Sequence, residues 1–224
     1  MTLFNLNADM AEGYGPWTMG DDEGLLDVVQ SANIACGFHG GDFNIMASVM
    51  ASAKAKGVSI GAHPGFHDLH GFGRRKMNLP EREIENLIAY QLGAALGMAA
   101  LVGAEITHVK PHGAINNMAA ADLTMARAIA RSIKAVDSNQ IMLAPALSEM
   151  VTAGQECGLT VVEELFADRA YMPDGQLAPR SRPDAMIHDP ALAVENCIRM
   201  LGEGTIIALD GSKISVSGRS ICVH

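Results

Sequence analysis

Aromatic side chains and basic charge are both scarce in this sequence. Phe, Trp and Tyr make up 4% of the 224 residues although hydrophobic residues make up 49%, so the core must be built from Ala, Val, Ile, Leu and Met. This composition suits helices packed on a parallel sheet better than an aromatic-rich β-sandwich. Sixteen basic residues stand against 25 acidic ones, a net charge of −9. That balance argues against a nucleic-acid partner, which needs a basic face, but leaves room for a local basic pocket.

Paired cysteines, a leader peptide and a membrane-spanning run are not found either. The four cysteines (Cys36, Cys157, Cys197 and Cys222) are far apart, with no C-x-x-C pair. We therefore expect reduced thiols in a cytoplasmic protein rather than a zinc ribbon or a disulfide framework. The N-terminus lacks a basic segment followed by a long apolar run, so no signal peptide is predicted. The longest apolar stretch, residues 92–104, is too short to cross a bilayer; we predict a buried helix and no membrane partner.

Several nucleotide-binding and hydrolase signatures are also missing. The sequence has no G-x-x-x-x-G-K-[ST] loop, no G-x-G-x-x-G after its first predicted strand, no H-E-x-x-H and no G-x-S-x-G. Any nucleotide would therefore be bound by a site of another kind.

What is present is a recurring strand–turn–helix pattern, with no low-complexity linker to divide it, so we predict one domain over residues 1–224. Strands are predicted at residues 3–8, 31–36, 58–62, 106–109, 140–143, 159–165 and 206–209, with a last extended segment at 220–223. Helices are predicted at residues 22–30, 42–56, 122–136 and 147–157, and from Pro80 and Asp189 onward. Because parallel strands need crossover helices, this order indicates an α/β fold with a parallel sheet. Periodicity does not separate a barrel from an open sheet.

Ionisable side chains lie just after the carboxyl ends of five predicted strands. They are Asp9 and Glu12, His39 and Asp42, His63, Lys110 and His112, and Asp168 and Arg169. Loops at these strand ends converge on the active site in α/β folds, and this placement favours a barrel. The predicted catalytic residues are Asp9, Glu12, His39, His63, Lys110, His112 and Asp168.

Some of these residues have structural alternatives. Alternation places Asn5, Asn7 and Asp9 on one side of the first strand, where they would form a polar network. Asp9 is then either a metal ligand or general base, or only part of a strand-end cluster. Asp42 either caps the next helix or helps to bind an anion at its N-terminus. Asp168 with Arg169 is a functional pair or a simple ion pair.

Two further segments concentrate basic groups or histidines. Pro111 ends the fourth strand and holds Lys110 and His112 around a rigid corner, where lysine can neutralise developing charge and histidine can transfer protons. In the turn at residues 71–76, Arg74 and Arg75 can bind a phosphate through their planar guanidinium groups, although a solvated basic loop has the same sequence. His67 and His70 are predicted at the surface, and His188 is predicted to be structural.

Seven motifs in series resemble the LamB/YcsF family, and they run through the whole chain. They are the segments at residues 5–13, 31–39, 61–65, 71–75, 108–114, 166–169 and 221–224. The resemblance implies a seven-stranded β/α barrel similar to the glycoside hydrolase/deacetylase fold. It also implies a role as the A subunit of the ATP-hydrolysing 5-oxoprolinase, which opens 5-oxoproline to glutamate together with two partner subunits.

The sequence departs from the usual pattern of this family at four places. A carboxylate usually stands at the position of Asn5 and a glycine at that of Ala11. A Leu-Tyr pair is usual where this chain has Ile115 and Asn116, a change that would alter a pocket wall. The family usually continues into a further helix after the motif that ends at His224, so we expect a shorter form.

The mechanism that this resemblance suggests begins with a stable amide. Phosphorylation of the lactam carbonyl oxygen by ATP, with Mg²⁺, would make that oxygen a leaving group, and the candidates for binding the cofactor's phosphoryl charge are Arg74, Arg75, Lys110 and Arg169. Asp9 or His112 would activate water. Alternatively, Asp9, His39 and His63 would hold a divalent metal, as in relatives of the fold. Two other functions stay open: a metal-dependent deacetylase or amidohydrolase acting alone on a sugar or small amide, and a non-catalytic ligand-binding subunit.

Overall fold

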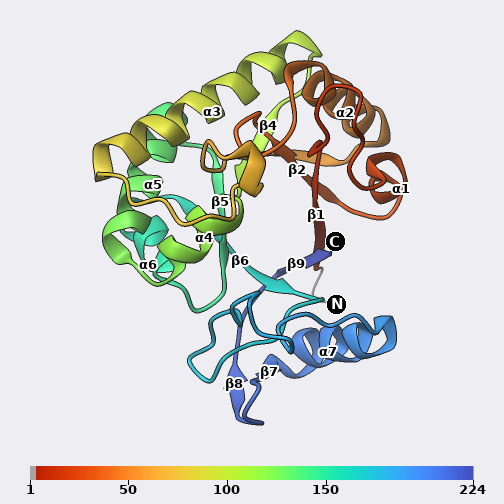
Figure 1. Cartoon of the computed structure of the whole chain (residues 1–224), viewed down its shortest axis with the longest axis vertical. Coiled ribbons are helices and arrows are strands. Elements are labelled where there is room, and N and C mark those ends of the chain that lie inside the picture. Colours follow the sequence, from red (N-terminus) through yellow and green to blue (C-terminus); the bar gives the residue numbers. More distant parts are fainter. Residues whose placement is uncertain (1–3, 224) are drawn as a thin grey trace.

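Seven parallel strands form a closed barrel in the computed structural model of the chain, which describes residues 4–223 (Figure 1). In barrel order the strands are β1 (Asn5–Met10), β2 (Ser31–Ala35), β3 (Ser59–His63), β4 (Ile106–Val109), β5 (Ile141–Pro145), β6 (Thr160–Phe166) and β9 (Ser220–Val223). The barrel is closed by Ser220, whose backbone is in register with both Asn5 of β1 and Glu164 of β6. The first predicted strand began at Leu3, which lies outside the described residues.

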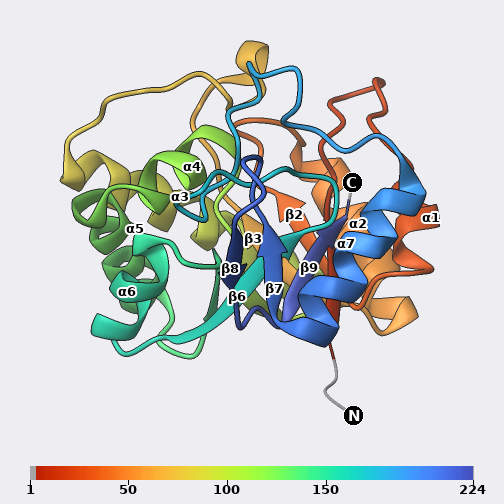
Figure 2. The same cartoon turned by 90° about the horizontal axis from the view of Figure 1, so that it is seen from below.

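The seventh barrel strand is not the one that the sequence predicted. Residues 206–209 were expected to supply it, but β7 (Thr205–Ile207) pairs antiparallel with β8 (Lys213–Ser215) in a separate two-stranded sheet. Its apolar Ile206 is buried with Tyr171 and Met200 in a small second core. The segment that does close the barrel is the last extended one, β9 (Figure 2).

Helices surround the barrel on its outer side (Figure 1). They are α1 (Asp22–Leu26), α2 (Phe43–Lys56), α3 (Glu81–Leu101), α4 (Gly113–Ala120), α5 (Leu123–Val136), α6 (Glu149–Glu156) and α7 (Pro190–Glu203), with a 3₁₀ turn at Leu69–Gly71. The side chain of Asp42 accepts hydrogen bonds from the backbone N–H groups of Asn44 and Ile45, so it caps α2, and Gly57 ends that helix in the left-handed conformation. Capping is thus the role that the structure gives Asp42.

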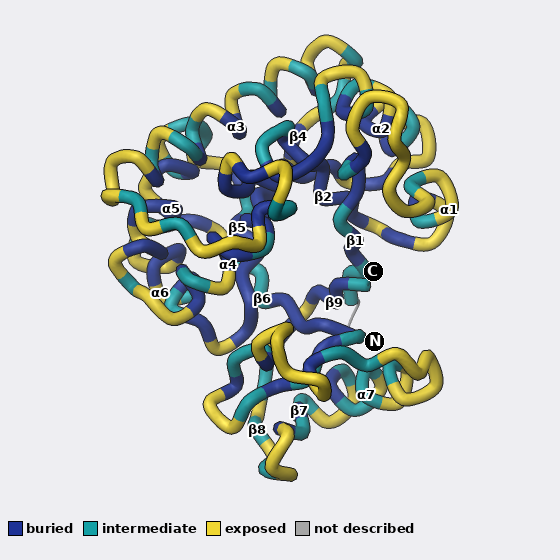
Figure 3. The backbone as a smooth tube through the Cα atoms, in the orientation of Figure 1, coloured by how far each residue is buried: buried dark blue, intermediate teal, exposed yellow. Residues whose placement is uncertain are grey.

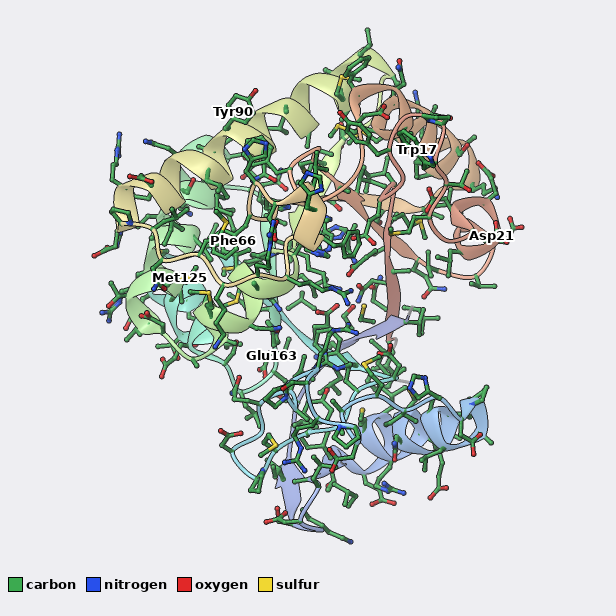
Figure 4. The ribbon with its side chains drawn as sticks, viewed as in Figure 1. Trp17, Asp21, Phe66, Tyr90, Met125 and Glu163 are labelled. Atoms are coloured by element: carbon green, nitrogen blue, oxygen red, sulfur yellow. The ribbon has the colours of Figure 1, made fainter. Side chains whose placement is uncertain are left out.

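The longest helix, α3, is buried on one face only. Its buried apolar residues Ile84, Ile88, Leu92, Ala95 and Ala99 form a stripe at helical spacing that faces the neighbouring helices and strands. On its outer face Tyr90 projects away from the barrel, and Leu101 is 75% exposed, so residues 92–104 are not the uniformly buried helix that was predicted (Figure 4). By length and composition alone α3 could cross a membrane, which is weak evidence because a helix of a protein core has the same properties.

Residues 167–219 leave the barrel between β6 and β9, and we call this segment the excursion (Figure 1). It carries α7, β7 and β8 and packs on the outer side of the barrel through the second core, which includes Leu165 and Ile221 from the flanking strands. Burial follows this plan: the barrel strands are mostly buried, and the helices show exposed residues along their outer sides (Figure 3). The excursion also leads the chain across the barrel mouth, where the candidate site lies.

Candidate active site

The inside of the barrel is lined by a polar network that begins on β1. Asn33 Nδ2 donates to Asn7 Oδ1 at 2.7 Å and to Asp9 Oδ1 at 2.9 Å. Asn7 Nδ2 donates to Ser220 Oγ at 2.8 Å, and Asn5 Nδ2 donates to Ser31 Oγ at 2.9 Å. The alternation of β1 therefore places Asn5, Asn7 and Asp9 in one network, as predicted.

Lys110 brings a buried cation into this network, and it lies between two acids. Its Nζ is 2.9 Å from Asp9 Oδ1 and 2.9 Å from Glu164 Oε1, and the side chain is only 3% exposed. Burial opposes its charge, but Asp9, Cys222 and Glu164 outweigh burial and raise the pKa of Lys110 well above its ordinary value. The pKa of Glu164 is raised because burial outweighs the attraction of Lys110.

Sequence reasoning missed Glu164. It lies within β6, whereas the search considered residues just after strand ends. The available signal was a pair of glutamates, Glu163 and Glu164, inside an otherwise apolar strand, because one of any two neighbours in a barrel strand must face inward.

Glu12, His39, His63 and His112 converge at the carboxyl ends of β1 to β4, and we call these four residues the histidine cluster. One ligand atom from each lies within 4.8 Å of every other. His39 Nε2 is 3.0 Å and His112 Nδ1 is 3.3 Å from Glu12 Oε1. The rings of His39 and His112 stack in parallel, with centroids 3.6 Å apart.

Two backbone carbonyls fix the tautomers in this cluster. The Lys110 carbonyl lies 2.6 Å from His63 Nδ1, and the Phe72 carbonyl lies 2.9 Å from His112 Nε2. A carbonyl can only accept, so both of these ring nitrogens carry the proton in neutral imidazoles. The opposite nitrogens, His63 Nε2 and His112 Nδ1, then face each other with lone pairs at 3.0 Å. Asp9 Oδ2, a further acceptor, is 3.2 Å from His63 Nε2.

The electrostatics keep the histidines neutral. Burial, followed by His39 and His63, lowers the pKa of His112 to about 2. Burial also lowers the pKa of His39 well below its ordinary value, with a further contribution from His63. The pKa of Glu12 is raised by burial and by Asp9. A histidine this hard to protonate is a poor proton acceptor but a suitable metal ligand, because ligation requires neutral imidazole.

The cluster therefore fits a divalent cation. Neutral imidazoles with one carboxylate suit several transition ions, and lone pairs held 3.0 Å apart repel unless a cation or a proton lies between them. His63 and His112 each donate their other N–H to a backbone carbonyl, as metal-bound histidines do. This set shares His39 and His63 with the predicted metal site, but Glu12 and His112 complete it, while Asp9 contacts Lys110.

The loop after β3 holds these rings by close approach of its backbone. Gly73 has φ +61°, and a Cβ placed there would lie 2.6 Å from His39 Cβ and 2.9 Å from His112 Cδ2. Phe72 packs edge-on against both rings. The glycine at position 73 is thus explained by contact with the cluster.

A cavity of about 740 Å³ opens beside the cluster at the barrel mouth. Of the predicted site residues, its lining includes Asp9, His63, Arg74, Lys110, His112 and Arg169. The lining also includes Arg180, which sequence reasoning missed. Asn116 lines the cavity while its neighbour Ile115 is fully buried, so one of the two unusual residues does form part of the pocket wall.

The remaining predicted residues lie elsewhere. Glu12 and His39 belong to the cluster behind the cavity wall. Arg75 does not line the cavity; its guanidinium binds the carboxylate of Asp68, although the side chain is 66% exposed. Asp168 is half-buried next to Arg169 and acts to raise the pKa of that arginine. His67 and His70 are exposed, as predicted.

Comparison with known proteins accounts for the seven motifs. The model of the LamB/YcsF family matches residues 4–224. The chain belongs to the LamB/YcsF family. Its Ala11 has φ +60° at a position where the family usually has glycine, so this member tolerates a left-handed alanine there.

Relatives within the LamB/YcsF family carry a functional name. The A subunit of 5-oxoprolinase from Rhodopseudomonas palustris (strain BisA53) is 48% identical over 225 residues, covering 100% of this chain and 88% of that protein. The protein of the same name from Methylococcus capsulatus is 50% identical, covering 98% and 85%. The crystal structure of a lactam utilization protein from Thermus thermophilus has a TM-score of 0.94 and 43% identity, covering 99% of this chain and 90% of that one. The predicted family and the seven-stranded parallel barrel are confirmed.

Proposed function

We propose that this chain is the A subunit of an ATP-dependent 5-oxoprolinase, in which it opens the lactam ring of 5-oxoproline to L-glutamate. Its relatives at about half identity carry that name, and a name of this kind implies an assembly of several subunits. We take the partners to be two further subunits. The four free cysteines and the need for ATP fit a cytoplasmic enzyme.

The observation that carries the proposal is the histidine cluster beside Lys110 at the barrel mouth. It supplies neutral nitrogen ligands, carboxylates and a fixed cation around one cavity. A cavity that served only to bind a carboxylate would need one or two such groups.

Each group has a distinct part in ring opening. Lys110 stays charged because its pKa is raised, so it stabilises negative charge on the lactam carbonyl oxygen rather than donating a proton. Asp9 lines the cavity and is the carboxylate best placed to take a proton from the attacking water. His112, the other predicted base, is unsuited because its pKa is about 2. A divalent metal held by Glu12, His39, His63 and His112 would polarise the carbonyl or lower the pKa of a bound water.

ATP enters through activation of the lactam within the complex. Arg74, Lys110 and Arg169 line the cavity and remain candidates to receive a phosphoryl group on the activated substrate. Arg75 is a weaker candidate because Asp68 already binds it.

The test is phosphate and glutamate release from ATP and 5-oxoproline, using this chain alone and then with its partner subunits. The complex should show 5-oxoproline-stimulated release. His63→Gln should lose at least about a hundredfold of that activity, whereas the exposed His67→Gln control should keep it. Absence of stimulation in every combination would refute the proposal. Ring opening or deacetylation by the chain alone without ATP would indicate a metal-dependent amidohydrolase instead.

A further inference from the structure

The arginines around the cavity differ from those elsewhere in the chain. Six arginines away from the cavity each form an ion pair with an acidic side chain. They are Arg75, Arg82, Arg127, Arg131, Arg182 and Arg199. At the cavity, Arg74 lies over the ring of Phe72, 5.0 Å from its centroid, and the two arginines of the excursion that line the cavity use still other partners.

Arg169 is the more buried of those two, at 4% exposure. Its Nη2 donates to the Ala178 carbonyl at 2.7 Å, which fixes the plane of the guanidinium. Its Nε is buried and has no hydrogen-bond partner within residues 4–223. A buried charged donor without an acceptor is costly, so its retention at a cavity wall points to a ligand.

Arg180 reaches the same cavity from eleven residues further along the excursion. Its Nη1 donates to Met186 Sδ at 3.2 Å, and a thioether is a weak acceptor. Arg169 and Arg180 oppose each other's charge: after burial, Arg180 is the main cause that lowers the pKa of Arg169 to about 10. Asp168 only partly offsets this repulsion.

We propose that Arg169 and Arg180 form a receptor for the carboxylate of the lactam substrate, with Arg74 at its rim. A planar guanidinium matches a carboxylate through two parallel hydrogen bonds, and an anion here would relieve the repulsion between the two cations. The same cavity wall carries Lys110, His63 and His112, so a lactam held by its carboxylate stays within the cavity that these groups line. The receptor thereby selects acidic lactams over uncharged ones.

The choice of a lactam as ligand rests on the proposed function, but binding of the anion does not require turnover. We would titrate the full chain by calorimetry with three probes: 5-oxoproline, the uncharged lactam 2-pyrrolidinone, and inorganic phosphate. Arg180 is exposed and can be changed without threatening the fold. The variant is Arg180→Gln, and the matched control is Arg182→Gln, because Arg182 lies in the same loop and pairs with Asp184.

Arg180→Gln should weaken 5-oxoproline binding roughly tenfold to a hundredfold, while the control leaves it unchanged and 2-pyrrolidinone binds all three proteins equally weakly. Equal binding of 5-oxoproline by Arg180→Gln and the original chain, or no binding by either, would overturn the receptor. Arg180-dependent binding of phosphate without binding of 5-oxoproline would overturn the carboxylate assignment in favour of a phosphoryl site. Arg180-dependent 5-oxoproline binding without turnover in any complex would leave the receptor standing and refute only the proposed reaction.

Discussion

Lys110→Met should destabilise the fold in a way that depends on pH. The substitution keeps the length of the side chain but removes the cation that lies 2.9 Å from both Asp9 and Glu164. Removing one partner from a buried ion pair costs about 3–5 kcal/mol, because the other charge stays buried without compensation. Two carboxylates are left here, so we expect a loss at the upper end of that range near neutral pH.

Glu164 sets the direction of the pH dependence. Burial already raises its folded-state pKa above the unfolded value, even with Lys110 present. Between those two pKa values the folded state holds more protons, so the free energy of unfolding falls as pH rises through this window. Without Lys110 the pKa of Glu164 rises further and the window widens. The loss should therefore be greater at about pH 8 than at about pH 5.5.

Urea unfolding followed by circular dichroism at both pH values measures this loss. The double variant Lys110→Met/Glu164→Gln should regain a large part of the stability, because one uncompensated charge is gone. Lys56→Met is a control: its exposed ion pairs with Glu23 and Asp27 predict a small change with little pH dependence. An equal loss at both pH values, or no recovery in the double variant, would refute this account of the buried charges.

Four further outcomes are expected. Gly61→Ala would place a Cβ against the ring of His108 inside the barrel, so the free energy of unfolding should fall by about 1–3 kcal/mol or more; an unchanged urea midpoint would contradict this contact. Asp42→Ala should cost about 1 kcal/mol through loss of the α2 cap, whereas Asp42→Asn should cost little in the same assay. The pKa of Asp68 is held at about 2, chiefly by the hydrogen bond from Arg75, so its contribution is present above the ordinary carboxyl pKa and is lost as pH falls toward 2; Asp68→Asn should flatten an acid-unfolding curve there. Removal of a metal from the histidine cluster by a chelator should lower stability by about 2.7 kcal/mol relative to metal at a hundred times its Kd, and re-addition of the metal should restore the thermal midpoint unless the cluster holds no cation.

Most of the barrel could be predicted from the sequence because each strand–helix unit has a local pattern. The exception is instructive. Residues 206–209 are short, apolar and preceded by a helix, as a barrel strand would be, while β9 is equally short and carries polar Ser220. What distinguishes them is the partner of each backbone: β9 is in register with β1 and β6, and β7 pairs with β8. Pairing over such separations leaves no mark on local periodicity.

The site divides in the same way. His39, His63 and His112 could be found because they follow strand ends, where barrel topology brings side chains together. The split between Arg74 and Arg75 could not, because adjacent residues of a turn point in different directions and only the structure shows that Asp68 takes the second one. Arg180 lies in a loop with several basic residues, and its arrival at the cavity depends on the path of the whole excursion.

The position of β9 also bears on how the chain folds during synthesis. β1 and β6 are both made before the excursion, yet neither gains its second barrel neighbour until β9 has emerged after residues 167–219. At roughly 5–20 residues per second, that interval lasts several seconds. During it two strand edges are open to pairing with other nascent chains, a hazard that closed barrels otherwise avoid. Helper proteins that cover exposed strands should therefore act on this chain late in translation, after β6 has left the ribosome and before the barrel can close.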